Sequence, residues 1–349
     1  MKSGRRDCIL IFRLGSIGDT VVALPCFHAL ARAFPNRRRV LLTNSLSSVR
    51  ASSAESVLTS TGLIDETIYY PASDFGLKNA VELIRELRRL RAATLVYMAE
   101  RLTARSVLRD LMYFKAAGIP RIVGAPWRRA FRDCRVDPGS LQLEHEAERL
   151  ARTLERFVPV SLGPREWDLR LSAGELAKAD EVLQAVVPST SLMAIAPGAK
   201  IQAKTWGAEN WSALIQSLAL DYSRSALIVV GAADERGLGT EVASNWRGPV
   251  LNLCGMLTPR ETAAVLRRCQ LMVCHDSGPM HLAATQQTRC VALFGNLNRP
   301  RQWYPFGDGH RVIQEPRGIR EIGVKRVADE IRSVFADRPR RDKAQTEVE

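Results

Sequence analysis

Short apolar runs alternate with amphipathic stretches along most of the chain, and this alternation limits the folds open to it. Runs such as Cys8–Phe12 and Cys290–Phe294 suit a buried strand and are far too short to cross a membrane. Between such runs, Leu77–Arg91 has apolar residues three and four positions apart, which predicts a helix. Strands that alternate with helices predict parallel sheets with helices on both faces.

The alternation is interrupted once, which predicts two domains. Val158–Pro164 contains two prolines and a glycine without periodicity, and the alternation restarts after it. The 349 residues also exceed the usual length of one domain. We expect an N-terminal domain over 1–165, a second over 166–325, and a terminal helix with a charged, mobile tail over 326–349. Two doubly wound domains would leave a ligand cleft between the carboxyl ends of their sheets.

The individual elements are expected at the following positions. The strands are Cys8–Phe12, Val40–Thr43, Glu66–Tyr70, Thr94–Tyr97, Arg121–Gly124, Leu192–Ala196, Ala226–Val230, Val250–Leu253, Leu271–Cys274 and Cys290–Phe294. The helices are Asp19–Phe34, Leu77–Arg91, Glu144–Phe157, Gly174–Val186, Trp211–Tyr222, Pro259–Arg268, Met280–Gln286 and Val324–Phe335.

Composition excludes several classes and leaves the charge as a clue. Hydrophobic residues make up 46% and charged residues 25%, as in globular proteins. The seven cysteines are scattered without a CxxC pair, so free thiols in a reducing cytosol are expected. The net charge is +13, and residues 1–170 carry 28 Lys and Arg against 18 Asp and Glu. A positive electrostatic field of this kind attracts polyanions. Clusters of arginine are, however, found on solvated surfaces as often as at binding sites.

A glycine-containing loop follows the first expected strand. It reads Arg13-Leu-Gly-Ser-Ile-Gly-Asp19. Gly15 and Gly18 allow a sharp turn and close approach to a ligand. Asp19 would face the cleft from the first helical turn, although aspartate there is also a common N-cap. The loop matches neither GxGxxG nor GxxxxGK[ST], so it indicates only that a ligand binds at the top of this strand.

Two further loops follow strands of the second half. After Leu192–Ala196, Gly198 permits close approach, and Lys200 and Lys204 suit a diphosphate, although loop lysines are usually just solvated. Trp206 and Trp211 are expected to pack within the protein rather than stack on a base.

After Leu271–Cys274, the segment His275-Asp-Ser-Gly-Pro-Met-His281 opens a helix. Its free N–H groups suit an anion, Pro279 fits the first turn, and His281 could donate to a phosphate. The two histidines lack the spacing of metal ligands on one helix face, so no metal is expected.

Several segments together carry a resemblance to a known family. They are Ile9–Thr20 with Ala23-Leu-Pro25, Pro197-Gly198, Lys204-Thr-Trp206 with Trp211, Gly231-Ala232, Asp276–Ala283 and Val291–Gly295. With them the chain resembles glycosyltransferase family 9, the bacterial ADP-heptose:lipopolysaccharide heptosyltransferases. The resemblance implies an α/β fold of the GT-B type, with two tandem Rossmann-like doubly wound domains and an interdomain cleft. It also implies inverting, metal-independent transfer of heptose from ADP-heptose to an anionic inner-core acceptor, without a cofactor.

The same resemblance assigns roles to individual residues. Asp19 would be the general base, and Lys204 would stabilise the departing nucleotide. The donor-binding residues would be Lys200, Thr205, Gly231, Asp234, Leu257, Asp276, Ser277, Gly278 and His281. The acceptor-side residues would be Arg13, Gly15, Ser16, Gly18 and Arg101.

The nucleotide is less closely defined than the fold. The acidic residue for the ribose comes late, as Asp234 or Glu235, and Leu257, with Met256 beside it, stands where adenine would pack. One alternative is an enzyme of the same family with another sugar donor or a protein acceptor. A second is a non-catalytic protein that binds nucleotide sugars or polyanions. The presence of Asp19, Lys204 and Asp276 argues against the second, because a binding protein would not need a base.

The resemblance also bears on partners and location. The partners implied are an ADP-sugar and an anionic glycolipid. A nucleic-acid partner is not expected, because no nucleic-acid motif is recognised. The location implied is cytoplasmic, and association with the inner face of the inner membrane would fit the basic first half. The acceptor hydroxyl and the oligomeric state are left open.

Overall fold

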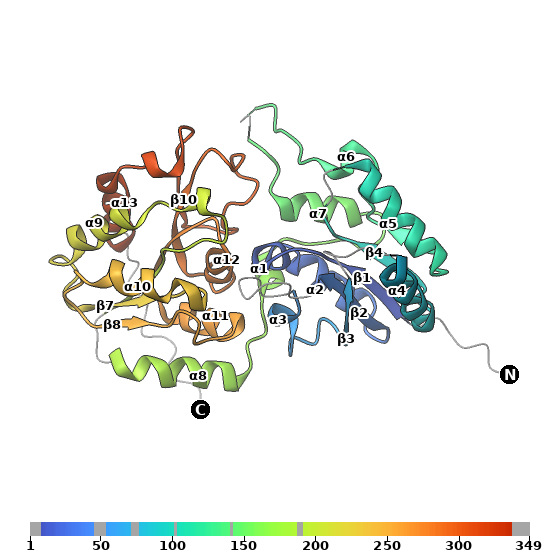
Figure 1. Cartoon of the computed structure of the whole chain (residues 1–349), viewed down its shortest axis with the longest axis horizontal. Helices are drawn as coiled ribbons and strands as arrows, with labels where there is room; N and C mark the ends of the chain where they lie inside the picture. Colours follow the sequence, from blue (N-terminus) through green and yellow to red (C-terminus); the bar gives the residue numbers. More distant parts are fainter. Residues whose placement is uncertain are drawn as a thin grey trace.

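Two parallel β-sheets, one in each half of the chain, form the framework (Figure 1). The computed structural model describes residues 8–44, 54–70, 77–100, 103–139, 142–186 and 191–336. The first sheet has the order β3-β2-β1-β4-β5, with β1 (Cys8–Phe12), β2 (Arg38–Asn44), β3 (Glu66–Tyr70), β4 (Thr94–Tyr97) and β5 (Arg121–Val123). The second has the order β11-β10-β9-β6-β7-β8, with β6 (Ser191–Ala196), β7 (Ser225–Val229), β8 (Val250–Asn252), β9 (Leu271–His275), β10 (Arg289–Phe294) and β11 (Arg311–Gln314).

The strand order creates one topological switch point in each sheet. In the first sheet, β1 pairs in parallel with both β2 and β4, so Leu10 lies opposite Val40 and Leu95. In the second sheet, β6 pairs in parallel with both β7 and β9. Successive connections therefore leave to opposite sides at β1 and β6, and a crevice forms beyond the carboxyl ends of these strands. The fold is the expected pair of Rossmann-like domains.

Helices cover both faces of each sheet. In the first half they are α1 (Ile17–Val21), α2 (Leu24–Ala33), α3 (Ala54–Leu58), α4 (Leu77–Leu90), α5 (Ala104–Ala116), α6 (Arg129–Arg132) and α7 (Glu146–Leu154). In the second they are α8 (Ala173–Leu183), α9 (Ala208–Leu218), α10 (Arg236–Ala243), α11 (Pro259–Arg268), α12 (Gly278–Thr285) and α13 (Val324–Ala336). Short 3₁₀ turns lie at Pro164–Trp167, Gln184–Val186, Gln202–Lys204, Ala233–Glu235 and Ile319–Glu321.

Alternate side chains of the central strands enter different cores. Leu10 and Phe12 pack with the residues of α4 and α5, whereas Ile9 and Ile11 join the core on the opposite face. This second core continues without interruption into the other half, where it includes residues of α11 and α12. Because both faces of a parallel sheet are covered, its strands are apolar throughout. The cysteines are free; six are buried and Cys134 is half-buried.

One expected helix is two helices. Residues 19–34 were expected to form a single helix, but α1 ends at Val21 and α2 begins at Leu24. Pro25 stands in the first turn of α2, where its missing N–H does no harm. In a continuous helix the same proline would leave the carbonyl of Val21 without its partner.

The two halves meet through short helices and polar contacts. α1 and α12 lie against each other at the centre of Figure 1. The guanidinium of Arg260 is buried and donates to the carbonyl oxygens of Val57 and Leu169 and to both carboxylate oxygens of Glu175. A buried guanidinium with this many partners holds the elements around it in one arrangement.

The C-terminal helix belongs to the second half. α13 packs against α9 and β10, and residues 337–349, which include the charged tail, lie outside the described part. We propose a domain boundary at 165/166, in the segment between α7 and α8. No helix within the described ranges has the length and apolar character needed to span a membrane.

Candidate active site

A cavity of about 890 Å³ lies at the carboxyl ends of the central strands of both sheets. All three loops singled out in the sequence reach it. From the first half come Leu14, Gly15, Ser16, Ile17, Gly18, Asp19, Asn44 and Glu100. From the second come Gly198, Lys200, Ile201, Lys204, Gly231, Glu235, Leu257, Asp276, Ser277, Gly278, His281 and Trp303, among others. The topological switch points of the two sheets thus open onto one space.

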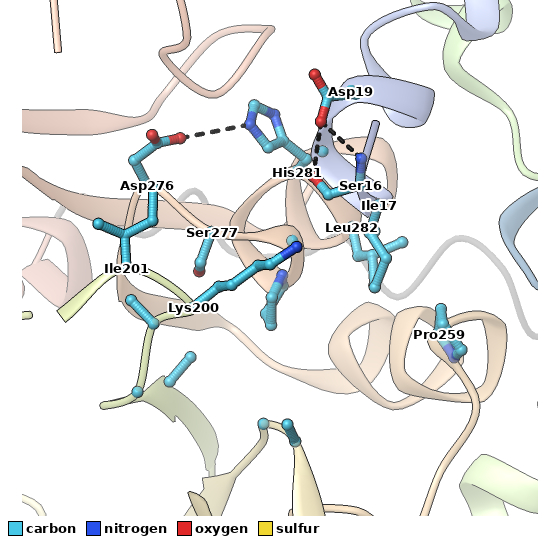
Figure 2. A pocket seen from close by; sticks show the side chains of 18 of the residues that line it. Ser16, Ile17, Asp19, Lys200, Ile201, Pro259, Asp276, Ser277, His281 and Leu282 are labelled. Atoms are coloured by element: carbon cyan, nitrogen blue, oxygen red, sulfur yellow. Dashed lines mark hydrogen bonds and ion pairs between the residues drawn. The ribbon is translucent and has the colours of Figure 1, made fainter. Parts of the chain in front are cut away.

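The loop after β1 orients the Asp19 carboxylate. Gly15 has φ +132°, a conformation that side chains disfavour, and its N–H donates to Oδ1 of Asn44 at 2.8 Å. Ser16 caps α1, and both its N–H and its hydroxyl donate to Oδ2 of Asp19, each at 2.7 Å. Figure 2 shows these two bonds. Two bonds to one oxygen fix the carboxylate and leave Oδ1 to face other groups.

Arg13 lies beneath the cavity and not in it, which corrects its expected acceptor-side role. Its side chain is fully buried. The guanidinium donates to the carbonyl oxygens of Met98 and Asp19 and lies 3.7 Å from Oδ1 of Asp19. Arg13 therefore places a positive charge behind the Asp19 carboxylate and ties the ends of β1 and β4 together.

Gly18 and Gly278 are small because the two halves touch at these positions. A Cβ on Gly18 would lie 2.8 Å from Cδ2 of His281. A Cβ on Gly278 would lie 3.1 Å from Cβ of Ile17. At Gly18, the close approach expected for a ligand is made instead by a histidine of the other domain.

A polar network surrounds Asp276 on the opposite wall of the cavity. Its Oδ2 accepts hydrogen bonds from Lys204 Nζ at 2.5 Å and Asn298 Nδ2 at 2.8 Å. Its Oδ1 lies 3.8 Å from Nε2 of His281, whose ring lies between Asp276 and Asp19 in Figure 2. Burial raises the pKa of Asp276, but His281 and Lys204 outweigh burial and lower it to about 2. Asp276 is therefore a carboxylate at neutral pH.

The amino terminus of α12 opens into the cavity. Ser277 is the N-cap residue but its side chain makes no capping bond, and Pro279 occupies the first turn. Ser277, Gly278 and His281 line the cavity here. Backbone N–H groups at a helix start, together with the helix dipole, bind anions. Lys200 points into the same space in Figure 2.

His275 supports the loop after β6 from below. Its Nε2 accepts from the backbone N–H of Trp206 at 3.1 Å and from the indole N–H of Trp211 at 3.2 Å, and Nδ1 faces the Gly198 carbonyl at 3.4 Å. Burial lowers the pKa of His275 to about 4. Both tryptophans are fully buried, as expected, and present no face to a base.

Two expected donor residues do not line the cavity. Asp234 is exposed outside it, while Glu235 lies in the wall and accepts a hydrogen bond from the N–H of Ala232 at 2.8 Å. A Cβ on Gly198 would lie 2.2 Å from Cδ of Glu235, so this glycine makes room for the carboxylate. Thr205 is buried and donates to the Gln202 carbonyl.

The remaining residues expected at the site differ in whether they line the cavity. Leu257 lines the cavity, whereas Met256 is exposed outside it. Arg101 lies outside the described residues. The sequence did not single out Asn44 or Glu100, although Asn44 ends β2 and Glu100 lies beyond the end of β4, the two strands that flank β1. That position is the signal that could have revealed them.

No metal centre is evident in the described ranges, where no three His, Cys, Asp or Glu side chains are placed to share an ion.

Solved structures share the fold of this chain. The crystal structure of a glycosyltransferase of family 9 from Veillonella parvula DSM 2008 matches with a TM-score of 0.74 and 16% identity, over 95% of this chain and 98% of that one. E. coli ADP-heptose lps heptosyltransferase II matches with a TM-score of 0.69 and 20% identity, over 94% and 98%. Two Rossmann-like domains around a shared cavity give this chain the GT-B fold.

Sequence comparison narrows the class. The model of glycosyltransferase family 9 (heptosyltransferase) matches residues 83–321, and the chain belongs to this family. Lipopolysaccharide heptosyltransferase 2 of Salmonella typhimurium is 27% identical over 230 residues, or 60% of this chain and 64% of that one. The curated relatives are covered over 33% to 64% of their length. The region matched by the family model starts at residue 83, after the Asp19 loop. The role of Asp19 therefore depends on its own motif and geometry.

Proposed function

We propose that this enzyme transfers heptose from ADP-heptose to an anionic inner-core acceptor of lipopolysaccharide. The observation that carries the proposal is that a carboxylate of the first domain, Asp19, shares one cavity with Lys204, Asp276 and His281 of the second. A base and an anion-binding wall that face each other suit transfer of a group from a diphosphate to a hydroxyl. The name of the structurally similar E. coli enzyme specifies the same donor.

Asp19 would act as the general base. An acceptor hydroxyl attacks the anomeric carbon of the donor, and the carboxylate removes the hydroxyl proton as the new C–O bond forms. The bond between the anomeric carbon and the diphosphate oxygen breaks on the opposite side. Attack and departure from opposite faces invert the anomeric configuration. Ser16 supports this role because it holds one carboxylate oxygen in place.

The second domain would stabilise the departing ADP. Lys200 and Lys204 supply positive charge, and the start of α12 supplies backbone N–H groups beside Ser277 and His281. These groups are in position before the reaction, so they stabilise the developing charge without reorganisation. No step requires a metal ion.

Recognition of the donor would involve the remaining wall. The ionised Asp276 suits sugar hydroxyls, with Lys204 moving from the carboxylate towards the diphosphate when the donor binds. Glu235 suits the ribose hydroxyls better than Asp234 because only Glu235 lines the cavity. Gly231 and Leu257 would border the nucleoside.

The basic first half would attract the acceptor. Its excess of Lys and Arg complements the phosphates and carboxylates of an inner core. We place the enzyme in the cytoplasm, with access to glycolipid at the inner face of the inner membrane.

Direct assay tests this proposal. Purified enzyme is incubated with ADP-heptose and heptose-deficient lipopolysaccharide, and ADP release and the mass of the product are measured. One heptose added per ADP released supports the proposal. If neither ADP release nor a heptosylated product is seen, the proposed activity is wrong.

Thermal stabilisation by ADP, UDP, GDP, CMP and NAD gives an independent measure of donor class. A ligand that binds the folded state raises Tm by mass action. Selective stabilisation by ADP supports an ADP-sugar. Stabilisation by UDP or GDP would retain the transferase and replace heptose by another sugar.

A further inference from the structure

Two polar side chains of the first domain line the cavity and have hydrogen-bonding groups that no described residue engages. Asn44 ends β2 and Glu100 follows β4, so they flank the loop after β1 on both sides. Oδ1 of Asn44 accepts from the N–H of Gly15, and its amide nitrogen has no partner among the described residues. Within the same ranges, the Glu100 carboxyl has neither a hydrogen bond nor an ion pair.

The charged groups around Glu100 show why no cation in the described part of the chain pairs with it. The nearby cations are committed elsewhere: Arg149 forms a buried pair with Glu146, and Arg13 bonds carbonyl oxygens beneath Asp19. The Glu100 side chain is exposed in the cavity. Partial loss of its hydration, together with Glu146 and Asp19, raises its pKa, and Arg13 and Arg149 offset this only in part. A second anion here would meet at least two carboxylates, so the surroundings disfavour a phosphate.

We propose that Glu100 and Asn44 form a subsite for neutral sugar hydroxyls that positions the acceptor against Asp19. The inference rests on the proposed function and specifies which part of an anionic acceptor enters the cavity. Glu100 accepts hydrogen bonds from one or two hydroxyls, and the free amide of Asn44 donates to another. The phosphates and carboxylates of the acceptor then lie outside the subsite, towards the arginines of the first half. Glu100 and Asn44 are positioning residues, since neither takes part in bond cleavage.

Glu100→Gln tests the carboxylate with little change in shape. Loss of a hydrogen bond to a charged group predicts an increase of about ten-fold or more in KM for heptose-deficient lipopolysaccharide. Both kcat and KM for ADP-heptose should stay within about three-fold, because Asp19 and the donor wall are unchanged. Glu86→Gln, at an exposed position on α4, is the matched control and should leave every constant unchanged.

The pH dependence separates positioning from a structural effect. As pH falls through the raised pKa of Glu100, acceptor KM of the wild type should rise towards the Glu100→Gln value. Acceptor KM of the variant should change less over the same range. Asp19 is one of the charged groups near Glu100. The other groups around Glu100 are Glu146 and Arg149 of α7, and Arg13.

Asn44→Asp keeps an oxygen for the N–H of Gly15 while removing the free amide. It too should raise acceptor KM and spare donor KM. If the wild type transfers heptose and both variants retain its acceptor KM, the subsite is wrong and the proposed function stands. If the wild type transfers no heptose, both are wrong.

Discussion

Asp19 is held by three contacts that a substitution would release together. Two bonds from Ser16 and the charge of Arg13 orient the carboxylate towards the cavity. We expect Asp19→Ala to lower kcat by about 10²–10⁴-fold, the usual contribution of a general base, with little change in ADP affinity. Turnover and calorimetric binding of ADP check this. Near-normal turnover would rule out the assigned role.

We propose that Lys204 changes its partner when the donor binds. Its Nζ donates to Oδ2 of Asp276 in this structure, and we propose that it neutralises the diphosphate when the donor is bound. Lys204→Ala should therefore weaken donor binding and lower kcat together, by ten-fold or more each. Lys178→Ala on α8, where the lysine pairs with Glu181 on the surface, is the control and should have no effect. Identical donor kinetics in the Lys204 variant would remove this lysine from the phosphate site.

The sequence located most of the cavity wall because loops after parallel strands converge. It could not show burial of individual side chains. The burial of Arg13 was not predictable, because its guanidinium donates to the carbonyl oxygen of Met98, 85 positions away in the chain. Glu235 and Asp234 are neighbours in the chain, and only the 3₁₀ turn at Ala233–Glu235 decides which of them faces the cavity.

The packing of α1 against α12 leaves no room for a methyl group. Gly18→Ala would force Cβ to 2.8 Å from the His281 ring, and overpacking of this kind costs about 1–3 kcal/mol. At Gly237 in α10 an added Cβ would meet no atom within 4 Å. Gly237→Ala should therefore raise the free energy of unfolding by about 0.5–1 kcal/mol, because alanine has the higher helix propensity. Denaturant unfolding of both variants measures the contrast. If the two variants have equal free energies of unfolding, the contact between α1 and α12 accommodates a methyl group without cost.

His275 should make stability sensitive to mild acid. Its folded pKa is about 4 against 6.5 as the ordinary value, so the unfolded chain takes up a proton first as pH falls. Its contribution is complete above pH 6.5 and is lost as pH falls towards 4, on the order of a few kcal/mol. His275→Gln should make the free energy of unfolding depend less on pH between pH 6.5 and 4. An unchanged slope would assign that dependence to other groups, such as His145.

Elements with continuous apolar runs or clear periodicity were predicted well, whereas some elements with glycine or polar residues in them were missed. β1, β3, β4 and α11 have the expected bounds. α10 was missed because Gly237 and Gly239 lower its helix propensity, and β11 because it is a short edge strand with charged or polar ends. α5 was missed although its buried residues Val107, Asp110 and Phe114 follow a helical period, because one of them is an aspartate.

Charge neutralisation by fixed groups bears on the metal requirement of the enzyme. Lysines and the α12 terminus already surround the space proposed for the diphosphate. EDTA should therefore leave the rate of heptose transfer unchanged, and added Mg²⁺ should not increase it. A loss of activity that Mg²⁺ restores would contradict this account and indicate a donor–metal complex.

The direct contact between α1 and α12 has a mechanical consequence. It lies beside both Asp19 and His281, so it can serve as a fulcrum for the two domains. A rotation that preserves the contact moves the distant rim of the cavity most and the space between these two side chains least. Such a rotation would therefore change the width of the rim more than the distance between Asp19 and His281.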